Sequence, residues 1–356
     1  MSVLINAYNY GRYIDDAIQS VVEQDFPAED VEIIVVDDGS TDDTPERMAR
    51  WGRRIHYIRK ENGGQASTYN VGFDSSRGEI ICFLDADDYW YHSKLTRVVK
   101  QFMADKTAKV VYHTLDVVDG EGNPLGVTPQ RFNNETVLNI PSSEYFQRMN
   151  RFTPPSSGIS VRAECLRAVM PVPQELRLAA DSYLHFFLPL YSECIHLITT
   201  PLGVYRAHGE SHGINPLGKR AYEPRKVQAM LDARHIVARH QPYQKPISET
   251  VVQAQRAVID SEIVKLEVLL HNITGEKRRA LAKAWSHRKT AGGQAKSDTL
   301  SLLLYALLPP MLFEKVKKVY RLLVPLQTAR GQTGGTQNDK GLGIFQKSKQ
   351  NIHQAP

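Results

Sequence analysis

The chain has 356 residues, of which 42% are hydrophobic and 23% charged, a composition typical of soluble globular proteins and sufficient for one large domain or two modest ones. Its three cysteines, Cys82, Cys165 and Cys194, are far apart and form no Cys-x-x-Cys pair. This spacing argues against a disulfide framework and a cysteine-based zinc site, and it fits a reducing cytoplasm.

The formal net charge of +5 comes from the C-terminal end of the sequence. Residues 300–356 contain eight Lys or Arg and two Asp or Glu, which leaves 36 basic and 37 acidic residues in the remainder. A nearly neutral body gives no reason to expect nucleic acid as a partner. The first apolar residues follow no basic region, so the sequence predicts no signal peptide and a cytoplasmic protein.

Apolar runs alternate with amphipathic segments over the first hundred residues. They predict four strands, at 3–5, 32–36, 55–58 and 80–84, separated by three helices, at 14–22, 44–51 and 65–75. The run Glu32–Val36 is apolar enough to be buried on both faces, as in a parallel sheet. This order predicts a right-handed, doubly wound α/β sheet, in which ligands bind beyond the carboxyl ends of the strands.

Polar residues follow three of these four strands. Asn6 and Tyr8 come after the first, Asp37–Ser40 after the second, and Asp85–Asp88 after the fourth. Because the carboxyl ends of parallel strands meet at one edge of a sheet, we expect these residues to converge on one crevice.

The pattern changes after residue 100. Strands are expected at 110–118, 159–161, 195–199 and 202–206, and helices at 163–169 and 181–191. This mixed α+β half, within a domain spanning 1–215, suits an acceptor site. Beyond it the sequence predicts a helical extension over 216–298, an apolar and basic amphipathic segment over 299–326, and a disordered tail over 327–356.

The acidic cluster Asp85-Ala86-Asp87-Asp88 suits a hard divalent cation. A diphosphate leaving group carries concentrated negative charge, and Mg²⁺ or Mn²⁺ held by one or two carboxylates offsets it. A bend after Leu84 would let Asp85 and Asp87 face the crevice, one toward a ribose and one toward the metal. The alternative is a solvated acidic turn, which is common after strands.

Two further segments suggest nucleotide contacts. In Val36–Ser40 a carboxylate is placed to accept a nucleobase N–H; the alternative is a plain strand-to-helix turn. Gly63 and Gly64 precede a predicted helix, where they either present N–H groups to phosphate or simply form the turn. The sequence has neither Gly-x-Gly-x-x-Gly nor a P-loop at this point, so a dinucleotide fingerprint is not supported.

Four motifs occur in order at suitable spacing, namely Ile5–Tyr10, Val36–Ser40, Glu61–Gly72 and Phe83–Asp88. Together they resemble glycosyltransferase family 2, whose members are inverting enzymes of the GT-A fold. The resemblance is close over about residues 1–100 and looser to about residue 215. It implies a Rossmann-like, mostly parallel sheet, a nucleotide-sugar donor with UDP as the expected nucleotide, and Mn²⁺ or Mg²⁺ as cofactor.

The resemblance also assigns the donor site. The residues it implies are Asn6, Tyr8 and Asp38 at the nucleobase, Asp85 at the ribose, Asp87 at the metal, and Asn70 within the nucleotide-sugar site.

A catalytic base is implied in a Glu-Asp pair at a later helix start. Asp181 matches the base, whereas Ala180 replaces the Glu. A base is chemically required, because the acceptor hydroxyl must lose its proton as it attacks the anomeric carbon. The alternative is that Asp181 caps the helix.

The segment Tyr205-Arg206-Ala207-His208 resembles a Tyr-Arg-x-His sequence found in many family members. His208 is a candidate ligand of the metal or the diphosphate, and Arg206 is a candidate phosphate contact. Either residue is also compatible with an ordinary loop position. Trp90 either stacks on a sugar or packs inside the protein.

Features of processive synthases are missing, because no Gln-x-x-Arg-Trp follows Asp181 and no apolar stretch of about 20 residues occurs. We therefore expect single additions, in cell-surface polysaccharide or glycolipid synthesis. Residues 300–325 suit docking on the inner face of the cell membrane, near a glycan or lipid-linked acceptor, or packing against protein. A sugar-phosphate nucleotidyltransferase and a catalytically inactive nucleotide- or glycan-binding scaffold remain alternatives.

Overall fold

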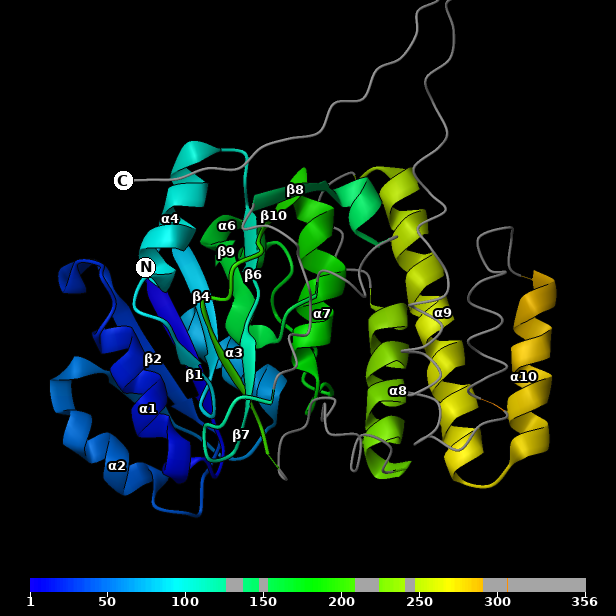
Figure 1. Cartoon of the computed structure of the whole chain (residues 1–356), viewed down its shortest axis with the longest axis horizontal. Coiled ribbons are helices and arrows are strands. Elements are labelled where there is room, and N and C mark those ends of the chain that lie inside the picture. Colours follow the sequence, from blue (N-terminus) through cyan, green and yellow to red (C-terminus); the bar gives the residue numbers. More distant parts are fainter. Residues whose placement is uncertain (126–136, 147–152, 209–223, 241–246, 291–305, 307–356) are drawn as a thin grey trace, which may run out of the picture. The chain divides into compact units, whose positions relative to one another are not determined.

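A mixed eight-stranded sheet organises the protein in the computed structural model (Figure 1). In spatial order its strands are β3 (His56–Arg59), β2 (Glu32–Asp37), β1 (Ser2–Ala7), β4 (Ile80–Asp85), β9 (Ile159–Arg162), β6 (Val110–His113), β10 (Cys194–Ile198) and β8 (Val137–Pro141). The first four run parallel, β9 lies antiparallel between β4 and β6, and β8 runs antiparallel to β10. A second sheet joins β5 (Tyr89–Trp90), β11 (Gly203–Ala207) and β7 (Asp116–Asp119).

The structure describes residues 1–125, 137–146, 153–208, 224–240, 247–290 and 306. They belong to one unit, Met1–Glu314, and a second unit, Lys315–Pro356, lies outside the described residues. The disordered tail predicted over 327–356 and the amphipathic segment predicted over 299–326, apart from Ala306, also lie outside them, so both stay predictions.

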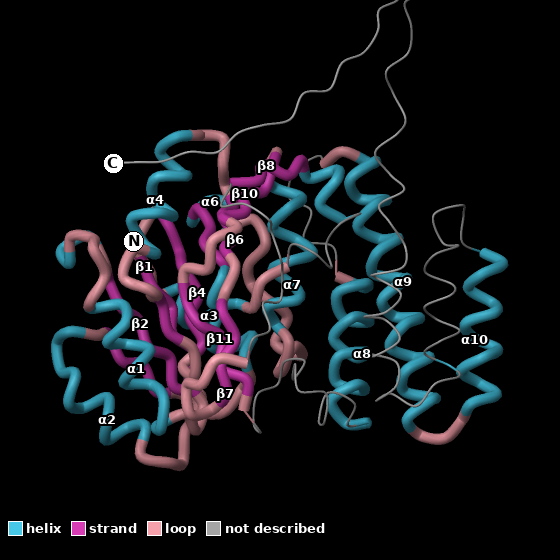
Figure 2. Tube along the Cα trace, viewed as in Figure 1, coloured by secondary structure: helices cyan, strands magenta, loops and turns pink. Residues whose placement is uncertain are grey.

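Helices cover both faces of the main sheet (Figure 2). One face carries α1 (Gly11–Val22), α2 (Thr44–Trp51) and α4 (Lys94–Ala104), and the other carries α3 (Gln65–Asp74), α6 (Ala163–Arg167) and α7 (Ala180–Phe187). Because side chains alternate along a strand, β1 serves both layers: Ile5 packs with α1, and Leu4 packs with α3. Burial on both faces explains why these strands are continuously apolar.

The predicted order of strands and helices over residues 1–85 is confirmed, as is the mostly parallel α/β sheet. The single strand predicted at 110–118 is wrong. The strand in the main sheet ends at His113, and Asp116 begins β7 in the second sheet. Between them Thr114 is buried, and its Oγ1 donates to the carbonyl of Thr199 at 2.9 Å. Helix α4 is absent from the sequence-based prediction, although its buried residues Leu95, Val98 and Phe102 recur with helical spacing.

Three further helices, α8 (Pro224–Arg239), α9 (Glu249–Ile273) and α10 (Lys277–Thr290), follow the strands. Ala233, Val237 and Ile259 from α8 and α9 are buried in the same core as α7. The helical character predicted for this region is confirmed, whereas the domain boundary predicted at 215 lies outside the described residues. Among the described helices, none combines the length and the apolar character that a membrane crossing requires.

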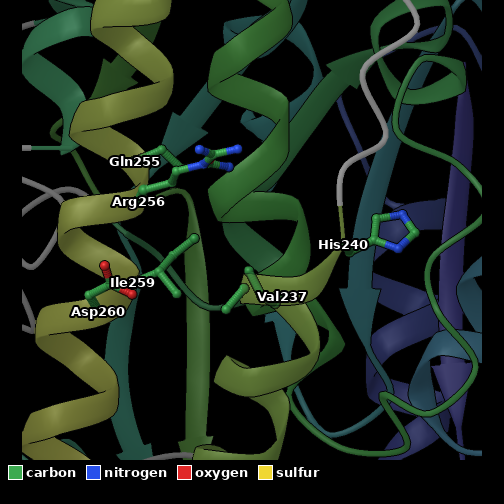
Figure 3. Close-up of a pocket in the computed structure, with 7 residues that line it drawn as sticks. Val237, His240, Gln255, Arg256, Ile259 and Asp260 are labelled. Carbon is green, nitrogen blue, oxygen red and sulfur yellow. The ribbon is translucent and has the colours of Figure 1, made fainter.

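Two hollows border the helical extension. One, of about 180 Å³, lies between α8 and α9 and is lined in part by His240, Arg256 and Asp260 (Figure 3). A larger cleft of about 910 Å³ shares His240 and is bordered by Asn70 and Val172. The described residues that line these two hollows do not include the acidic cluster after β4.

Two buried histidines, His113 on β6 and His185 on α7, are held neutral. Burial lowers the pKa of each from 6.5 to about 3, and the positive charges of Lys94 and Arg97 also lower that of His113. Between these two pH values the unfolded chain binds more protons than the native protein does. The free energy of unfolding therefore falls as the pH is lowered through this window.

Replacing His113 with Asn removes one of these protonation sites. Between pH 7 and pH 5, we expect the wild type to lose about 2 kcal/mol more unfolding free energy than His113→Asn, as measured by urea denaturation. The control is His56→Asn, at an exposed position on β3, which should keep the wild-type pH dependence. Equal pH dependence in all three proteins would contradict this account.

Candidate active site

The carboxyl ends of β1, β2 and β4 meet where the strand order of the main sheet reverses (Figure 1). β1 pairs with β2 on one side and with β4 on the other, and Asn6 lies directly opposite Asp85. Asp38 follows β2, and its N–H donates to the carbonyl of Ala7 at 2.8 Å. The predicted convergence of the polar strand ends is confirmed, at a point where open α/β sheets bind ligands.

Three carboxylates crowd together after β4. Asp85, Asp87 and Asp88 each place an oxygen so that all lie within 4.8 Å of one another. Burial and the charge of Asp87 raise the pKa of Asp85 to about 7, and burial with both neighbouring carboxylates raises the pKa of Asp88 well above its usual range. This concentration of negative charge favours the binding of a cation.

A Pro- and Ser-rich turn just before β9 binds two carboxylates of the cluster. This short helical turn, η3 (Ser156–Gly158), precedes β9 directly. Ser156 Oγ donates to Asp85 Oδ2, and Ser157 Oγ donates to Asp88 Oδ2 at 2.5 Å. Ser157 Oγ also accepts the backbone N–H of Asp85 at 3.1 Å. Nothing in the local sequence of this turn indicates that its hydroxyls hold the carboxylates.

Asp88, which has no predicted role, connects the cluster to β11. Its Oδ1 accepts the backbone N–H of Arg206 at 2.9 Å, which fixes the end of β11 beside the cluster. Two residues later His208 Nε2 lies 2.9 Å from Asp87 Oδ2. The structure therefore brings together Asp87 and His208, the two residues predicted as metal ligands.

Aromatic rings enclose His208. The rings of Tyr10 and Tyr13 have centroids 5.7 and 5.1 Å from that of His208. Burial and the charges of Asp87 and Asp85 raise the pKa of Tyr10, which shows that its phenol lies close to the cluster. Neither tyrosine is among the site residues predicted from the sequence, although Tyr10 ends the first family motif. Tyr8, predicted at the nucleobase, is 45% exposed and free to contact a ligand.

The predicted phosphate contact of Arg206 is not supported by its position. Its Nη2 donates to Asp16 at 2.6 Å, and its guanidinium carbon lies 4.9 and 5.0 Å from the ring centroids of Tyr13 and Tyr89. The side chain is buried, and its charge is offset by Asp16. The side chain of Arg206 therefore joins β11 to α1. Its backbone N–H contacts the site, because it donates to Asp88.

Asp38 is already well bound. Its two carboxylate oxygens accept the backbone N–H groups of Gly63 and Gly64 at 2.8 and 2.7 Å, and Lys60 Nζ donates at 2.6 Å. The two glycine N–H groups therefore serve Asp38, and the phosphate role considered for them is wrong in this structure. Each carboxylate oxygen accepts about two hydrogen bonds, so Oδ2 retains capacity for a nucleobase N–H.

Two other predicted ligand contacts are occupied by structural ones. The Asn70 amide donates to the carbonyl of Val172 and accepts its N–H, both at 2.8 Å, so the prediction that Asn70 binds the nucleotide sugar is not supported. Trp90 packs inside the protein: it is 3% exposed, its Nε1 donates to Ser157 O at 2.9 Å, and Lys94 Nζ lies 3.5 Å from its ring centroid.

Asp181, on α7, lies near enough to the acidic cluster for its charge to act on Asp85. Burial raises its pKa, and its charge in turn raises the pKa of Asp85. It is the second residue of α7, whose N-cap residue is Ala179 in the left-handed region at φ 56°. Asp181 is therefore not the N-cap residue, although its Oδ1 accepts the N–H of Ser182 in the first turn at 2.8 Å. Ala180, where the family has Glu, is buried in the core, and its N–H donates to Gln65 Oε1 at 2.8 Å.

The residues at the cluster fit a hard divalent ion. Within the described part of the chain, Asp85 Oδ1 and Asn6 Oδ1 are buried without a hydrogen-bond partner. Buried oxygens in this state are costly, and a cation would satisfy them. Carboxylate and amide oxygens are the ligands that Mg²⁺ and Mn²⁺ prefer, and an imidazole such as that of His208 is compatible with Mn²⁺.

Comparison with known sequences gives a consistent assignment. Residues 2–163 match the family described as Glycosyl transferase family 2. An uncharacterized glycosyltransferase of Nostoc sp. is 32% identical over 238 residues, which cover 65% of this chain and 72% of that protein. Some relatives are much longer: the chain spans 18% of a Rickettsia bellii glycosyltransferase that is 37% identical over 127 residues.

Solved structures share the fold. TarS 1–349 of Staphylococcus aureus in complex with UDP-GlcNAc has a TM-score of 0.57 at 17% identity, over 90% of this chain and 91% of that one. A mannosyltransferase from Pyrobaculum calidifontis in complex with GDP-Man and Mn²⁺ has a TM-score of 0.51 at 19% identity, over 90% and 84%. The predicted GT-A fold is confirmed. With the family match and the Nostoc relative, the chain is a glycosyltransferase and belongs to glycosyltransferase family 2.

Proposed function

We propose that this glycosyltransferase is inverting and metal-dependent, and that it moves a sugar from a nucleotide diphosphate sugar to a hydroxyl acceptor. The observation that carries the proposal is the pairing of Asp87 with His208 beside Asp85. The charge of Asp181, which acts on Asp85, indicates a further carboxylate near the same cluster. One group of residues would hold the leaving diphosphate and one carboxylate would take the acceptor proton.

The donor side would be built on the ends of β1, β2 and β4. We place the nucleobase beside Asn6, Asp38 and the exposed ring of Tyr8. Asp85 is assigned to the ribose. UDP is the proposed nucleotide, since the TarS complex with UDP-GlcNAc shares the fold, although GDP-Man occupies the mannosyltransferase. Asn70 and the side chain of Arg206 are left out of this assignment.

Asp87 and His208 are the residues that would hold the divalent ion, Mn²⁺ or Mg²⁺, which when bound would offset the charge that develops on the departing diphosphate. Asp88 acts indirectly, because it binds the backbone N–H of Arg206 near the end of β11, and His208 directly follows that strand. The rings of Tyr10 and Tyr13 pack against the imidazole ring of His208.

Asp181 is the proposed base. The carboxylate would accept the proton of the acceptor hydroxyl as its oxygen attacks the anomeric carbon, opposite the bond to the diphosphate. Burial, which raises the pKa of Asp181, makes it a better proton acceptor near neutral pH. A single carboxylate in this role is the arrangement of an inverting transfer, in which no covalent glycosyl-enzyme forms.

The proposed acceptor is a glycan or lipid-linked hydroxyl, in cell-surface polysaccharide or glycolipid synthesis. The amphipathic pattern of residues 300–325 motivates a peripheral contact with the cell membrane, with basic residues toward anionic lipid.

Deletion of residues 300–356 should move the protein from the membrane to the soluble fraction; unchanged partitioning would exclude this contact.

Turnover assays test the reaction class. With UDP-GlcNAc or GDP-mannose and Mn²⁺, we expect release of the nucleoside diphosphate, abolished by EDTA. Asp87→Asn should lower the rate by about 10²–10³-fold, as expected for loss of one charge-stabilising group. Asp74→Asn, an exposed carboxylate at the end of α3, is the matched control and should behave as wild type. Pyrophosphate release would instead indicate a nucleotidyltransferase, and no release from any donor a scaffold.

Substitution of the base should separate binding from chemistry. Asp181→Asn keeps the shape and removes the proton acceptor, so we expect kcat for transfer to fall by about 10²–10⁴-fold while UDP affinity, measured by calorimetry, stays within about twofold. Transfer at the wild-type rate in Asp181→Asn would eliminate this residue as the base.

A further inference from the structure

A second group of metal-ligating side chains lies outside the active site. Asp105, Cys194 and His196 each place a ligand atom so that all three lie within 4.8 Å of one another. Cys194 is a free thiol of intermediate exposure, and His196 Nε2 lies 3.1 Å from Asp105 Oδ2. None of these residues has a role in the proposed transfer reaction.

The positions of β10 and of the end of α4 bring the three residues together. Cys194 and His196 are two residues apart on β10, so their side chains leave the same face of the strand. Hydrogen-bonded neighbours on both sides, β6 and β8, keep β10 in place. On this face Ile198 packs in the core with Phe102 of α4, and Asp105 directly follows α4.

Asp105 is oriented for a ligand. Its Oδ1 accepts the N–H and the hydroxyl of Thr107, at 2.8 and 2.7 Å, so this oxygen is occupied. Oδ2 is left to face His196. The side chain of Asp105 is 33% exposed, whereas that of His196 is 4% exposed, so the group is held by a buried imidazole and opens toward solvent at the carboxylate.

The group is separate from the acidic cluster. β4 and β6 both run antiparallel to β9, and β10 runs parallel to β6, so all three point the same way. Cys194 lies at the amino end of β10, whereas Asp85 lies at the carboxyl end of β4. The two residues are therefore at opposite ends of the strands (Figure 1).

We propose that Asp105, Cys194 and His196 form a second metal site, which binds Zn²⁺ or a similarly thiophilic divalent ion. Cysteine sulfur, histidine nitrogen and aspartate oxygen are all zinc ligands, and three protein ligands with water in the fourth position form an open tetrahedral zinc site. The thiolate distinguishes this site from the oxygen-rich cluster after β4, which suits harder ions. Binding replaces the hydrogen bond between His196 and Asp105 and releases the thiol proton of Cys194 to solvent.

The site would fasten the end of α4 to β10. An ion that binds the native protein and not the unfolded chain raises the melting temperature, by roughly 2–6 °C at saturating concentration for a protein of this size. The absence of a Cys-x-x-Cys pair makes a zinc site built on paired cysteines unlikely. Here a single cysteine is joined by a histidine on the same strand and by a carboxylate that is distant in the sequence.

Titration of the full-length protein with Co²⁺ tests the proposal. A thiolate ligand gives a sulfur-to-cobalt charge-transfer band in the near ultraviolet, and we expect one equivalent of it in the wild type. Cys194→Ser should abolish the band and His196→Asn should weaken Co²⁺ binding by at least about tenfold. Cys165→Ser, which removes a buried thiol elsewhere, and Asp87→Asn, which alters the acidic cluster, should retain the band.

A second measurement uses the wild type and so does not depend on the folding of any variant. Zn²⁺ should protect Cys194 from alkylation by iodoacetamide, as read by mass spectrometry of its peptide, and EDTA should reverse this protection. A missing charge-transfer band, a band that survives Cys194→Ser, or alkylation of Cys194 that Zn²⁺ does not slow would overturn the proposal and leave an ordinary hydrogen-bonded Asp–His pair. These outcomes are independent of whether the enzyme transfers sugar.

Discussion

The crowding of three carboxylates at the end of β4 is the constraint on which the rest of the site depends. Like charges this close repel one another, and burial adds to the cost of keeping them ionised. The protein holds them with donors from distant segments: two serine hydroxyls of η3 and a backbone N–H of β11. A divalent ion held by these carboxylates would relieve the remaining repulsion.

This constraint explains why the site extends beyond the part of the chain that matches the family. The match ends at residue 163, whereas Asp181 and His208 follow it. Asp88 supplies the connection, because the same carboxylate binds Ser157 on one oxygen and the β11 backbone on the other. Trp90 adds a second link through its hydrogen bond to Ser157 O, with Lys94 packed on its ring. The small second sheet therefore positions His208 rather than merely enlarging the fold.

Local sequence signals predicted the strands whose carboxyl ends place Asn6, Asp38 and Asp85, because periodicity and parallel topology determine where strand ends meet. They failed where a side chain had a distant partner. Asn70 lies in a family motif, yet it binds the backbone of Val172, 102 residues away. Arg206 likewise has a distant partner, because its guanidinium donates a hydrogen bond to Asp16, 190 residues away. Which way a polar side chain points depends on contacts far apart in sequence, and spacing alone does not encode them.

The central claim is that the cluster after β4 and His208 hold a hard divalent ion together with a nucleoside diphosphate. Electron paramagnetic resonance of Mn²⁺ in the presence of UDP measures this directly, since bound Mn²⁺ loses the sharp signal of the free ion. Mn²⁺ prefers oxygen-rich ligand sets, so the Asp105, Cys194 and His196 group should contribute little. The account predicts one UDP-dependent ion in the wild type and none in Asp87→Asn. Undiminished binding in Asp87→Asn, or binding that ignores UDP, would contradict it.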